Sequence, residues 1–517
     1  MRSLYFTPDH EMFRNTVRQF IEKEVAPHAE DWEKNQRIPH FIWTRMGELG
    51  FLGINYPEQY GGTGADFFYS VVFLEELPRS TMGGFAAAVS VHEYMAAEYI
   101  YRFGSETLKN NYLIPSIKGE KIGALAVTEP NTGSDVAAIR TKAVRDGDYY
   151  IINGSKTFIT NGVFGDFVIV ATKTDTEAGA GGISLIIVDH TTPGFSARQL
   201  HKMGWHSSDT GELTFEDVRV PITNLIGEEN RGFYYIMECF QLERLVGAIG
   251  SLNGALLGLE LTLRYIKERQ AFSRPLAKFQ VIRHAMADLK TELEAARQFT
   301  YYTAWLHSQG EMAVDYSSMA KLLTSELAKK TADVCLQFFG GYGYMDEYLI
   351  SRMYRDVRVG TIVGGTSEIM REIIARILID QVDYRPAQER KEKEQPLEGK
   401  LEETLPPTPH TAADIFQSLP ERFLPEKAGD WETVFHFDIS GPEGGQFTAT
   451  VKKGKCSVER GLNGEAKCTV KVSDKTYKDV ETGRTKAEVA FMTGKIRISD
   501  LAEMMQFTKM FRRLPKI

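Results

Sequence analysis

The sequence predicts a multidomain protein in which an all-α region, a β-barrel or β-sandwich, an α-helical bundle and a small α+β domain follow one another. Three observations support this prediction. The chain has 517 residues, 43% hydrophobic and 25% charged, a globular composition in a chain too long for one compact core. The spacing of apolar residues changes from helical to alternating and back to helical. A stretch rich in Glu, Lys, Gln and Pro then separates the last region from the rest.

Residues 1–118 have the pattern of helices. Apolar residues recur at helical spacing, as in Val17, Phe20 and Ile21, and glycines and prolines interrupt the pattern near residues 57–64. We therefore expect an all-α N-terminal domain.

Residues 119–228 have the pattern of strands. The segment 149–152 leads into Asn153-Gly154, a dipeptide typical of a two-residue hairpin turn. Two apolar runs, 167–170 and 183–188, follow as candidate buried strands. A β domain with a hairpin turn at Asn153-Gly154 is therefore expected.

Residues 229–380 return to long helical periods with very few prolines, which predicts an α-helical bundle. Residues 381–410 end in Pro-Pro-Thr-Pro and hold too few apolar side chains to form a core, so we expect a linker there.

Residues 411–517 have the pattern of a small α+β domain. Apolar and polar residues alternate, as in half-buried strands, over 435–439, 447–451 and 468–472. Amphipathic segments, 413–423 and 501–511, flank these strands.

Charge and cysteine content argue against several classes of function. The formal net charge of -8 gives no basic field for nucleic acid. The four cysteines lie far apart without metal-ligand spacing, so neither a disulfide framework nor a metal site is expected. The N-terminus resembles neither a signal nor a transit peptide, which favours a cytoplasmic protein. We find no uninterrupted apolar run of about eighteen residues and expect no membrane span.

Two linked motifs in the β region carry a family resemblance. The segment LAVTEPNTGSD over residues 125–135 resembles the signature of the acyl-CoA dehydrogenase family, and FITNG over residues 158–162 follows at that family's spacing. Further matching segments are YGGTG (60–64), KMGW (202–205), FEDV (215–218), RQAF (269–272), QFFGG (337–341) and GGTSE (364–368). The resemblance covers about residues 1–380. It implies that family's three-part fold, an FAD cofactor and a homotetramer or homodimer.

By resemblance, this chain would hold FAD with several separate segments. Val127, Thr128 and Thr160 would hold the polar edge of the isoalloxazine ring, Phe158 would cover one ring face, and Ser134 would reach the pyrophosphate. The full implied cofactor set is Leu125, Val127, Thr128, Gly133, Ser134, Phe158, Ile159, Thr160, Arg269, Phe272, Gln280, Gln337, Gly340, Gly341, Thr366 and Glu368. Singly, such threonines and glycines are better explained as caps and turns. Their joint occurrence at the family's spacings favours the cofactor site.

The resemblance also implies that the cofactor is shared between subunits. In this family Arg269, Phe272 and Gln280, with Gln337 and Gly341, meet FAD across a subunit boundary. Cofactor retention and oligomerisation are therefore expected to be coupled.

Dehydrogenation at the Cα–Cβ bond needs a carboxylate that removes the α proton. Many family members carry it just before the Gly-Thr of the C-terminal motif, where this chain has Gly364. Members resembling the long-chain and isovaleryl enzymes carry it in a Leu-Glu-Arg-Leu context, which residues 242–245 reproduce. Glu243 is therefore the expected catalytic base. By resemblance, the substrate-binding residues are Ser134, Gln241, Leu242, Arg244, Gly364 and Gly365.

An alternative is that Glu243 only pairs with a neighbouring cation on a helix surface. Leu242, Leu245 and Val246 argue against it, because a glutamate desolvated by apolar neighbours has a raised pKa, as a general base needs.

The C-terminal region carries a second resemblance. The segments AKCTVKVSD (466–474) and FMTGKIRI (491–498) resemble the sterol carrier protein type two family, and the match covers about residues 411–517. Such domains enclose a lipid or fatty acyl-CoA in an apolar tunnel. Candidate lining residues are Met504, Met505, Phe507 and Phe511, although core packing alone would also explain them.

Together the motifs predict FAD-dependent α,β-dehydrogenation of an acyl-CoA, with long chains favoured, to the trans-2-enoyl-CoA. The resemblance implies an electron-transferring flavoprotein as acceptor, and the fused domain would concentrate lipid or acyl-CoA near the active site. Two alternatives are a flavin-dependent hydroxylase of the same fold and a non-enzymatic lipid or acyl-CoA carrier.

Overall fold

The chain divides into two compact units, Met1–Arg385 and Pro386–Ile517, which are described separately. The computed structural model describes residues 4–382, 384, 411–428, 431–482, 485, 490–491, 494–500, 503–504, 506–507 and 510–511. The expected linker, residues 381–410, lies almost entirely outside the described residues.

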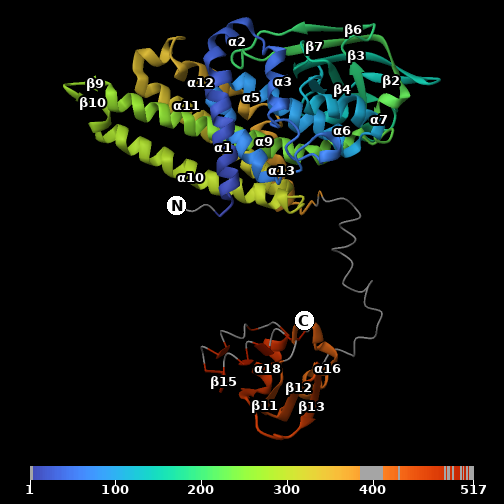
Figure 1. Cartoon of the computed structure of the whole chain (residues 1–517), viewed down its shortest axis with the longest axis vertical. Helices are drawn as coiled ribbons and strands as arrows, with labels where there is room; N and C mark the ends of the chain where they lie inside the picture. The colour runs from blue at the N-terminus through green and yellow to red at the C-terminus, as the bar shows by residue number, and fades with distance from the viewer. Residues whose placement is uncertain are drawn as a thin grey trace. The chain divides into compact units, whose positions relative to one another are not determined.

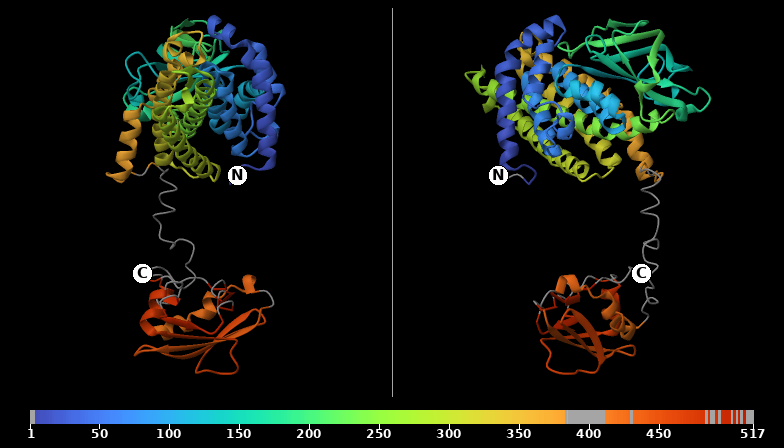
Figure 2. Two further views of the ribbon diagram at one scale, coloured as in Figure 1. Left: turned by 90° about the vertical axis from the view of Figure 1, so that its left-hand side faces the viewer. Right: turned by 45° about the vertical axis from the view of Figure 1, so that its right-hand side comes forward.

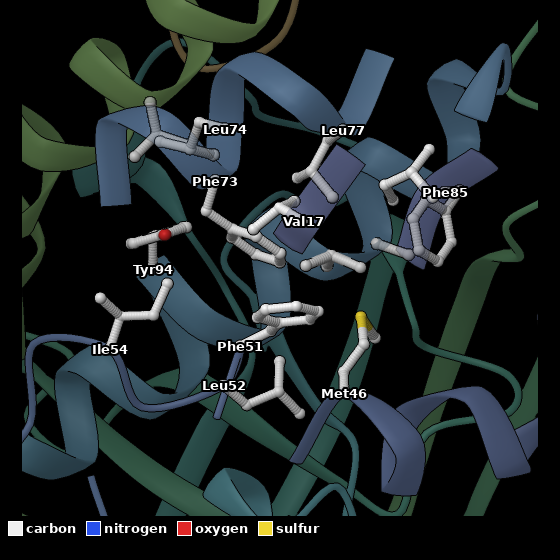
Figure 3. Packing of buried hydrophobic residues seen from close by; sticks show 14 of the residues in the cluster. Val17, Met46, Phe51, Leu52, Ile54, Phe73, Leu74, Leu77, Phe85 and Tyr94 are labelled. Carbon is white, nitrogen blue, oxygen red and sulfur yellow. The ribbon is translucent and has the colours of Figure 1, made fainter. Parts of the chain in front are cut away.

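The first part of unit 1 is helical, as expected. Its helices are α1 (Pro8–Phe20), α2 (Ala29–Asn35), α3 (His40–Glu48), α4 (Phe67–Glu76), α5 (Gly83–Val91), α6 (Ala97–Phe103), α7 (Glu106–Leu108) and α8 (Ile114–Ile117). Local caps fix several of their starts: Thr7 forms a capping box with His10 on α1, and the Asp66 side chain accepts the N–H of Phe68 on α4. The apolar faces meet in a core that includes Val17, Phe51, Phe73 and Phe85 (Figure 3).

Helices α5 and α6 form one continuous rod interrupted by a π-helical turn, η5 (His92–Ala96). A π turn accommodates one extra residue, so the face that follows it is rotated by about 100° relative to an uninterrupted α-helix. This rotation determines which side chains of α6 reach the rest of the unit.

The middle part is an eight-stranded sheet with strand order β6-β7-β3-β2-β4-β5-β8, in which β1 also pairs in parallel with β4. Its strands are β1 (Gly123–Ala126), β2 (Lys142–Asp146), β3 (Tyr149–Thr160), β4 (Phe167–Lys173), β5 (Ile183–Asp189), β6 (Phe195–Gln199), β7 (Thr210–Pro221) and β8 (Leu225–Ile226). Strands β4 and β5 are almost wholly buried because one face packs on helices and the other on the remaining strands. This explains their uninterrupted apolar runs.

The predicted hairpin turn at Asn153-Gly154 is wrong. Strand β3 runs straight through this dipeptide, and the chain reverses at Gly147 (φ +58°) instead. The pairing of β3 with β7 shifts register between Ile152 and Gly154, and a Cβ on Gly154 would lie 2.5 Å from the Thr141 Oγ1. The glycine therefore marks a bulge and a close approach of two strands. An Asn-Gly dipeptide alone does not distinguish such a bulge from a hairpin turn.

The last part of unit 1 is the expected helical bundle. Its helices are α9 (Gly232–Glu268), α10 (Gln280–Ser308), α11 (Val314–Phe339), α12 (Leu349–Val357) and α13 (Ser367–Leu378), and a short hairpin of β9 (Gln270–Ala271) and β10 (Arg274–Pro275) joins α9 to α10. Helix α9 packs along both α10 and α11. The β9–β10 hairpin and the eight-stranded sheet lie at opposite ends of the unit (Figures 1 and 2).

Helix α9 contributes to three separate cores. Ile236 and Cys239 pack with the sheet, Leu242 and Leu245 pack with the N-terminal helices, and a third set from Leu252 onward packs with α10 and α11. The middle of this helix therefore lies where all three parts of the unit meet.

Helix α9 is apolar over much of its length. Among the described helices it is long and apolar enough to cross a membrane by length and composition, and half of the relevant window is buried inside the unit. Charged residues, among them Glu243, Arg244 and Glu260, interrupt the apolar residues of this helix. Core helices of folded domains often have this composition.

Unit 2 is an α+β domain, as expected. A five-stranded sheet with order β13-β12-β11-β14-β15 combines antiparallel pairs with one parallel pair, β11 with β14. The elements are α15 (Ala412–Gln417), α16 (Leu419–Arg422), α17 (Pro425–Ala428), β11 (Thr433–Ser440), β12 (Gly445–Lys452), β13 (Lys455–Arg460), β14 (Cys468–Ser473), α18 (Asp474–Glu481) and β15 (Ile496–Ile498). The segment 501–511 is only partly described, and Phe507 and Phe511 within it are buried against the sheet.

Candidate active site

Glu243 lies in the middle of α9 and is 9% exposed. Its neighbours Leu242 and Leu245 belong to the core of the N-terminal helices. The Tyr99 hydroxyl, from α6, donates a hydrogen bond to the Glu243 Oε1 at 3.0 Å. The carboxylate is therefore held between two parts of the unit and does not lie on a solvated helix surface.

Burial raises the pKa of Glu243 to about 7, while the hydrogen bond from Tyr99 and the charge of Arg244 act in the opposite direction. A carboxylate with this pKa is partly ionised at neutral pH and binds a proton readily. These are the properties of a general base.

The residues on either side of Glu243 carry buried polar atoms without partners. Within the described part of the chain, the Gln241 Oε1 and the Arg244 Nε have no hydrogen-bond partner. Burial lowers the pKa of Arg244 to about 10. Buried polar groups are normally paired, so these two atoms could accept or donate a hydrogen bond to a bound polar group.

A glycine turn, Gly364-Gly365, contacts α11 through Lys321. Gly364 and Gly365 have φ values of +63° and +89°, in the left-handed region, and their N–H groups make no hydrogen bond to any residue that the structure describes. The buried Lys321 of α11 donates to the Gly365 carbonyl oxygen at 2.5 Å and lies close enough to Arg244 for the two cations to repel each other. Lys321 thus connects the turn to the residues around Glu243.

The segments with the linked motifs meet at β3. Lys156, fully buried, donates to the Val127 carbonyl oxygen at 3.0 Å and to the Glu129 Oε1 at 2.8 Å. The N–H of Thr157 donates to the Thr128 carbonyl oxygen at 2.9 Å. The motif segment 125–135 is therefore fixed to β3 by the two residues that directly precede the motif 158–162.

Phe158 follows directly, with a left-handed φ of +62° and a side chain that is 69% exposed. Holding a large aromatic residue in this conformation is costly, and an exposed ring gains stability when an apolar face covers it. A planar ring of the isoalloxazine type would provide that face, and Thr128 and Thr160 are half-buried residues of the same two segments. The residues present fit a flavin.

The residues expected to meet FAD across a subunit boundary lie near the β9–β10 hairpin, at the far end of the unit. Arg269, Gln337, Gly340 and Gly341 line one cavity of about 600 Å³, and the Arg269 guanidinium lies 5.3 Å from the Tyr342 ring centroid. Phe272 is not part of this cavity; it is 91% exposed. One copy of the chain does not bring these residues to Phe158.

The structure thus places the predicted residues in three groups. The first group lies on and beside β1 and β3 and consists of Leu125, Val127, Thr128, Gly133, Ser134, Phe158, Ile159 and Thr160. The second group lies on α9 and, through Lys321, at the glycine turn; it consists of Gln241, Leu242, Glu243, Arg244, Gly364, Gly365, Thr366 and Glu368. The third group lies toward the hairpin end and consists of Arg269, Phe272, Gln280, Gln337, Gly340 and Gly341. Thr366 also caps α13 by accepting the N–H of Ile369.

Sequence reasoning missed Tyr99, Lys156 and Lys321. For Lys156 a signal was present: counted in steps of two from Tyr150 and Ile152, it falls on the buried face of its strand, where an unpaired lysine would be unstable. Tyr99 and Lys321 lie in ordinary helical patterns and gave no such signal.

Comparisons with known proteins agree with this arrangement. Family models described as the N-terminal, middle and C-terminal domains of acyl-CoA dehydrogenase match residues 7–120, 124–218 and 230–379. A model described as the SCP-2 sterol transfer family matches residues 415–512. The mitochondrial long-chain specific acyl-CoA dehydrogenase of Sus scrofa is 42% identical over 377 residues, covering 72% of this chain and 87% of that protein.

Solved structures give the same result. An acyl-CoA dehydrogenase from Geobacillus kaustophilus matches with a TM-score of 0.71 and 46% identity over 73% of this chain and 100% of that chain. A structure described as the electron transferring flavoprotein of Acidaminococcus fermentans matches with a TM-score of 0.71 and 38% identity over 73% and 100%. A glutaryl-CoA dehydrogenase from Mycobacterium smegmatis in complex with FADH2 matches with a TM-score of 0.69 and 30% identity over 74% and 97%.

Proposed function

The chain belongs to the acyl-CoA dehydrogenase family and carries an SCP-2 sterol transfer domain at its C-terminus, and we propose that it oxidises the Cα–Cβ bond of an acyl-CoA. The substrate is a thioester with a long acyl chain, and the product is the trans-2-enoyl-CoA. The single observation that carries this proposal is Glu243, a buried carboxylate whose pKa is raised to about 7. A group of this kind is what removal of a weakly acidic α proton requires.

FAD bound at Val127, Thr128, Phe158 and Thr160 would accept the hydride. The residues of this chain supply the remaining steps. Glu243 removes the α proton and becomes neutral, which its buried surroundings favour. The free N–H groups at Gly364 and Gly365 donate to the thioester oxygen, where negative charge develops as the proton leaves.

Arg244 and Lys321 add positive charge near this developing anion. Both are buried, and both have a pKa lowered by burial, to about 10 and about 8. Buried cations act through a low dielectric and are therefore effective at short range. A bound thioester anion would relieve their mutual repulsion.

Anaerobic bleaching of the bound flavin by a series of acyl-CoAs tests this function. We expect wild type to bleach and Glu243→Gln to lose at least about a thousandfold in rate, while Glu260→Gln, on the same helix but half-buried and paired with Arg264, stays at the wild-type rate. Bleaching by Glu243→Gln at the wild-type rate would eliminate Glu243 as the base. Rapid oxygen consumption with product hydroxylation would favour the hydroxylase alternative instead.

We also propose that the active enzyme is a homotetramer or homodimer in which Arg269, Phe272, Gln280, Gln337 and Gly341 complete the cofactor site of a neighbour. The exposure of Phe272 and the distance of this group from the sheet support it. Sedimentation of Arg269→Ala with and without added FAD tests this: loss of both FAD and assembly is expected, and a fully loaded monomer would contradict it.

Two further partners belong to this proposal. The acceptor is an electron-transferring flavoprotein, supported by family membership and by the structural match from Acidaminococcus fermentans. The C-terminal domain binds lipid or acyl-CoA among the aromatic residues of its core, which include Phe507 and Phe511; Met505 lies outside the described residues. A cytoplasmic location stays a prediction.

A further inference from the structure

We propose that Tyr99 is the positioning residue of the catalytic base: its hydroxyl occupies one carboxylate oxygen of Glu243 and directs the other toward the substrate. This inference rests on the proposed role of Glu243. It adds a function for a residue on α6, outside every motif identified in the sequence.

The contact itself has the required geometry. The Tyr99 hydroxyl donates to the Oε1 at 3.0 Å, the Tyr99 side chain is fully buried, and Glu243 is 9% exposed. Among the residues that the structure describes, this is the one hydrogen bond that the carboxylate accepts, so the Oε2 is left without a partner. A base held by one oxygen keeps the other in a fixed direction, which lowers the cost of reaching the reactive geometry.

Tyr99 is itself held rigidly. One turn further along α6, the Phe103 ring stacks on the Tyr235 ring of α9 with centroids 4.1 Å apart, and Arg102 forms an ion pair with Glu238 of α9. The two helices therefore touch at successive turns along α9, with Tyr99 at the turn that carries Glu243. Because η5 rotates the face of α6 by about 100°, residue 99 points at α9 only when this π turn is present.

The titratable groups around Glu243 come from several helices. Arg244 and Cys239 lie on α9 itself, Tyr99 and Arg102 come from α6, and Lys321 of α11 lies beyond Arg244. Cys239 and Tyr99 are neutral, since burial raises the pKa of both. Arg244 and Tyr99 are the two groups that favour the ionised carboxylate, and of these only Tyr99 donates a hydrogen bond to it.

The hydrogen bond stabilises the carboxylate more than the carboxylic acid, so removing it raises the pKa of Glu243 further above about 7. For Tyr99→Phe we expect the acid limb of the kcat/KM profile to move up by about one pH unit. At pH 7 the reductive half-reaction then slows about five-fold, and the rate recovers by about pH 9. A residue with a merely structural role would lower the rate equally at every pH.

Tyr301→Phe is a matched control, because Tyr301 is another buried tyrosine that donates to a buried glutamate, Glu75 of α4, and not to Glu243. This control should keep the wild-type pH profile. Infrared difference titration of the carboxyl band, with Glu243→Gln as the blank, measures the same pKa shift directly in the flavin-loaded protein.

If Tyr99→Phe does not fold, 3-fluorotyrosine at position 99 keeps the ring and makes the hydroxyl a stronger donor. The acid limb should then move down instead of up. Profiles that superimpose on wild type in either variant would overturn the positioning role while leaving Glu243 as the base. Full activity of Glu243→Gln would instead remove the proposed function on which the inference rests.

Discussion

Lys156 and Glu129 form a fully buried ion pair, with the Lys156 Nζ 2.8 Å from the Glu129 Oε1 and 3.0 Å from the Val127 carbonyl oxygen. Glu129 also accepts the N–H groups of Arg140 and Thr141. Burial lowers the pKa of Lys156 to about 8. Removing the two charges from water therefore costs free energy, which the additional hydrogen bonds must offset. It joins the two segments that carry the flavin motifs.

Lys156→Met should therefore weaken cofactor binding as well as stability. Loss of one partner leaves a buried carboxylate unpaired, which typically costs about 3–5 kcal/mol, and it releases the Val127 carbonyl beside the flavin. We expect FAD to dissociate at least about tenfold faster, measured by the recovery of free flavin fluorescence on dilution. Lys173→Met removes another buried lysine from the same sheet and is the control. Equal FAD retention by the two variants would contradict a specific role for Lys156.

Glu243 should reduce stability at the pH at which it works. Its pKa is about 7 in the folded protein and 4.5 when exposed, so the native state binds a proton more tightly than the unfolded state. Below about pH 4.5 Glu243 is protonated in both states and contributes its whole share of the free energy of unfolding. This contribution is lost as the pH rises from about 4.5 through 7. Glu243→Gln should thus raise the free energy of unfolding by up to about 3 kcal/mol at pH 8 and leave it nearly unchanged at pH 4.5. Thermal unfolding of the FAD-loaded proteins at both pH values measures this, and an effect of opposite sign would show that burial does not control the group.

Gly364 and Gly365 should differ in their tolerance of a methyl group. Both have left-handed backbone, so alanine costs about 1 kcal/mol at either position. A Cβ on Gly364 meets nothing within 4 Å, whereas one on Gly365 would lie 2.6 Å from the Met370 Cε. We expect Gly365→Ala to lose more stability and more bleaching rate than Gly364→Ala. Equal losses would mean that backbone strain alone decides the outcome.

Deletion of residues 381–517 should leave flavin content and the oxidation of short acyl-CoAs unchanged. Unit 1 has its own cores, and unit 2 contributes through the high effective concentration of a tethered ligand. The apparent Michaelis constant should rise about tenfold or more for long-chain substrates only. Steady-state kinetics over a chain-length series is the measurement, and equal changes for short and long chains would reject a delivery role.

The sequence predicted the order of helical and β regions because each region keeps one period of apolar residues over many positions. It could not predict the path of β3 at Asn153-Gly154, since a turn and a bulge both need glycine and only the partner strand distinguishes them. Glu243 was predicted from its neighbours in the chain. Tyr99 could not be, because its contact with Glu243 joins residues 144 positions apart and depends on the register of a π turn.

The three cores along α9 have a mechanical consequence for Glu243. Because α9 packs in three separate cores, the loss of packing in one of them leaves the direction of the helix determined by the other two. A cavity made beside the sheet, or in the bundle, would therefore lower the stability of the unit before it moved the base. The position of the reactive oxygen is in this sense redundantly determined, and the hydrogen bond from α6 then has to set only its final orientation.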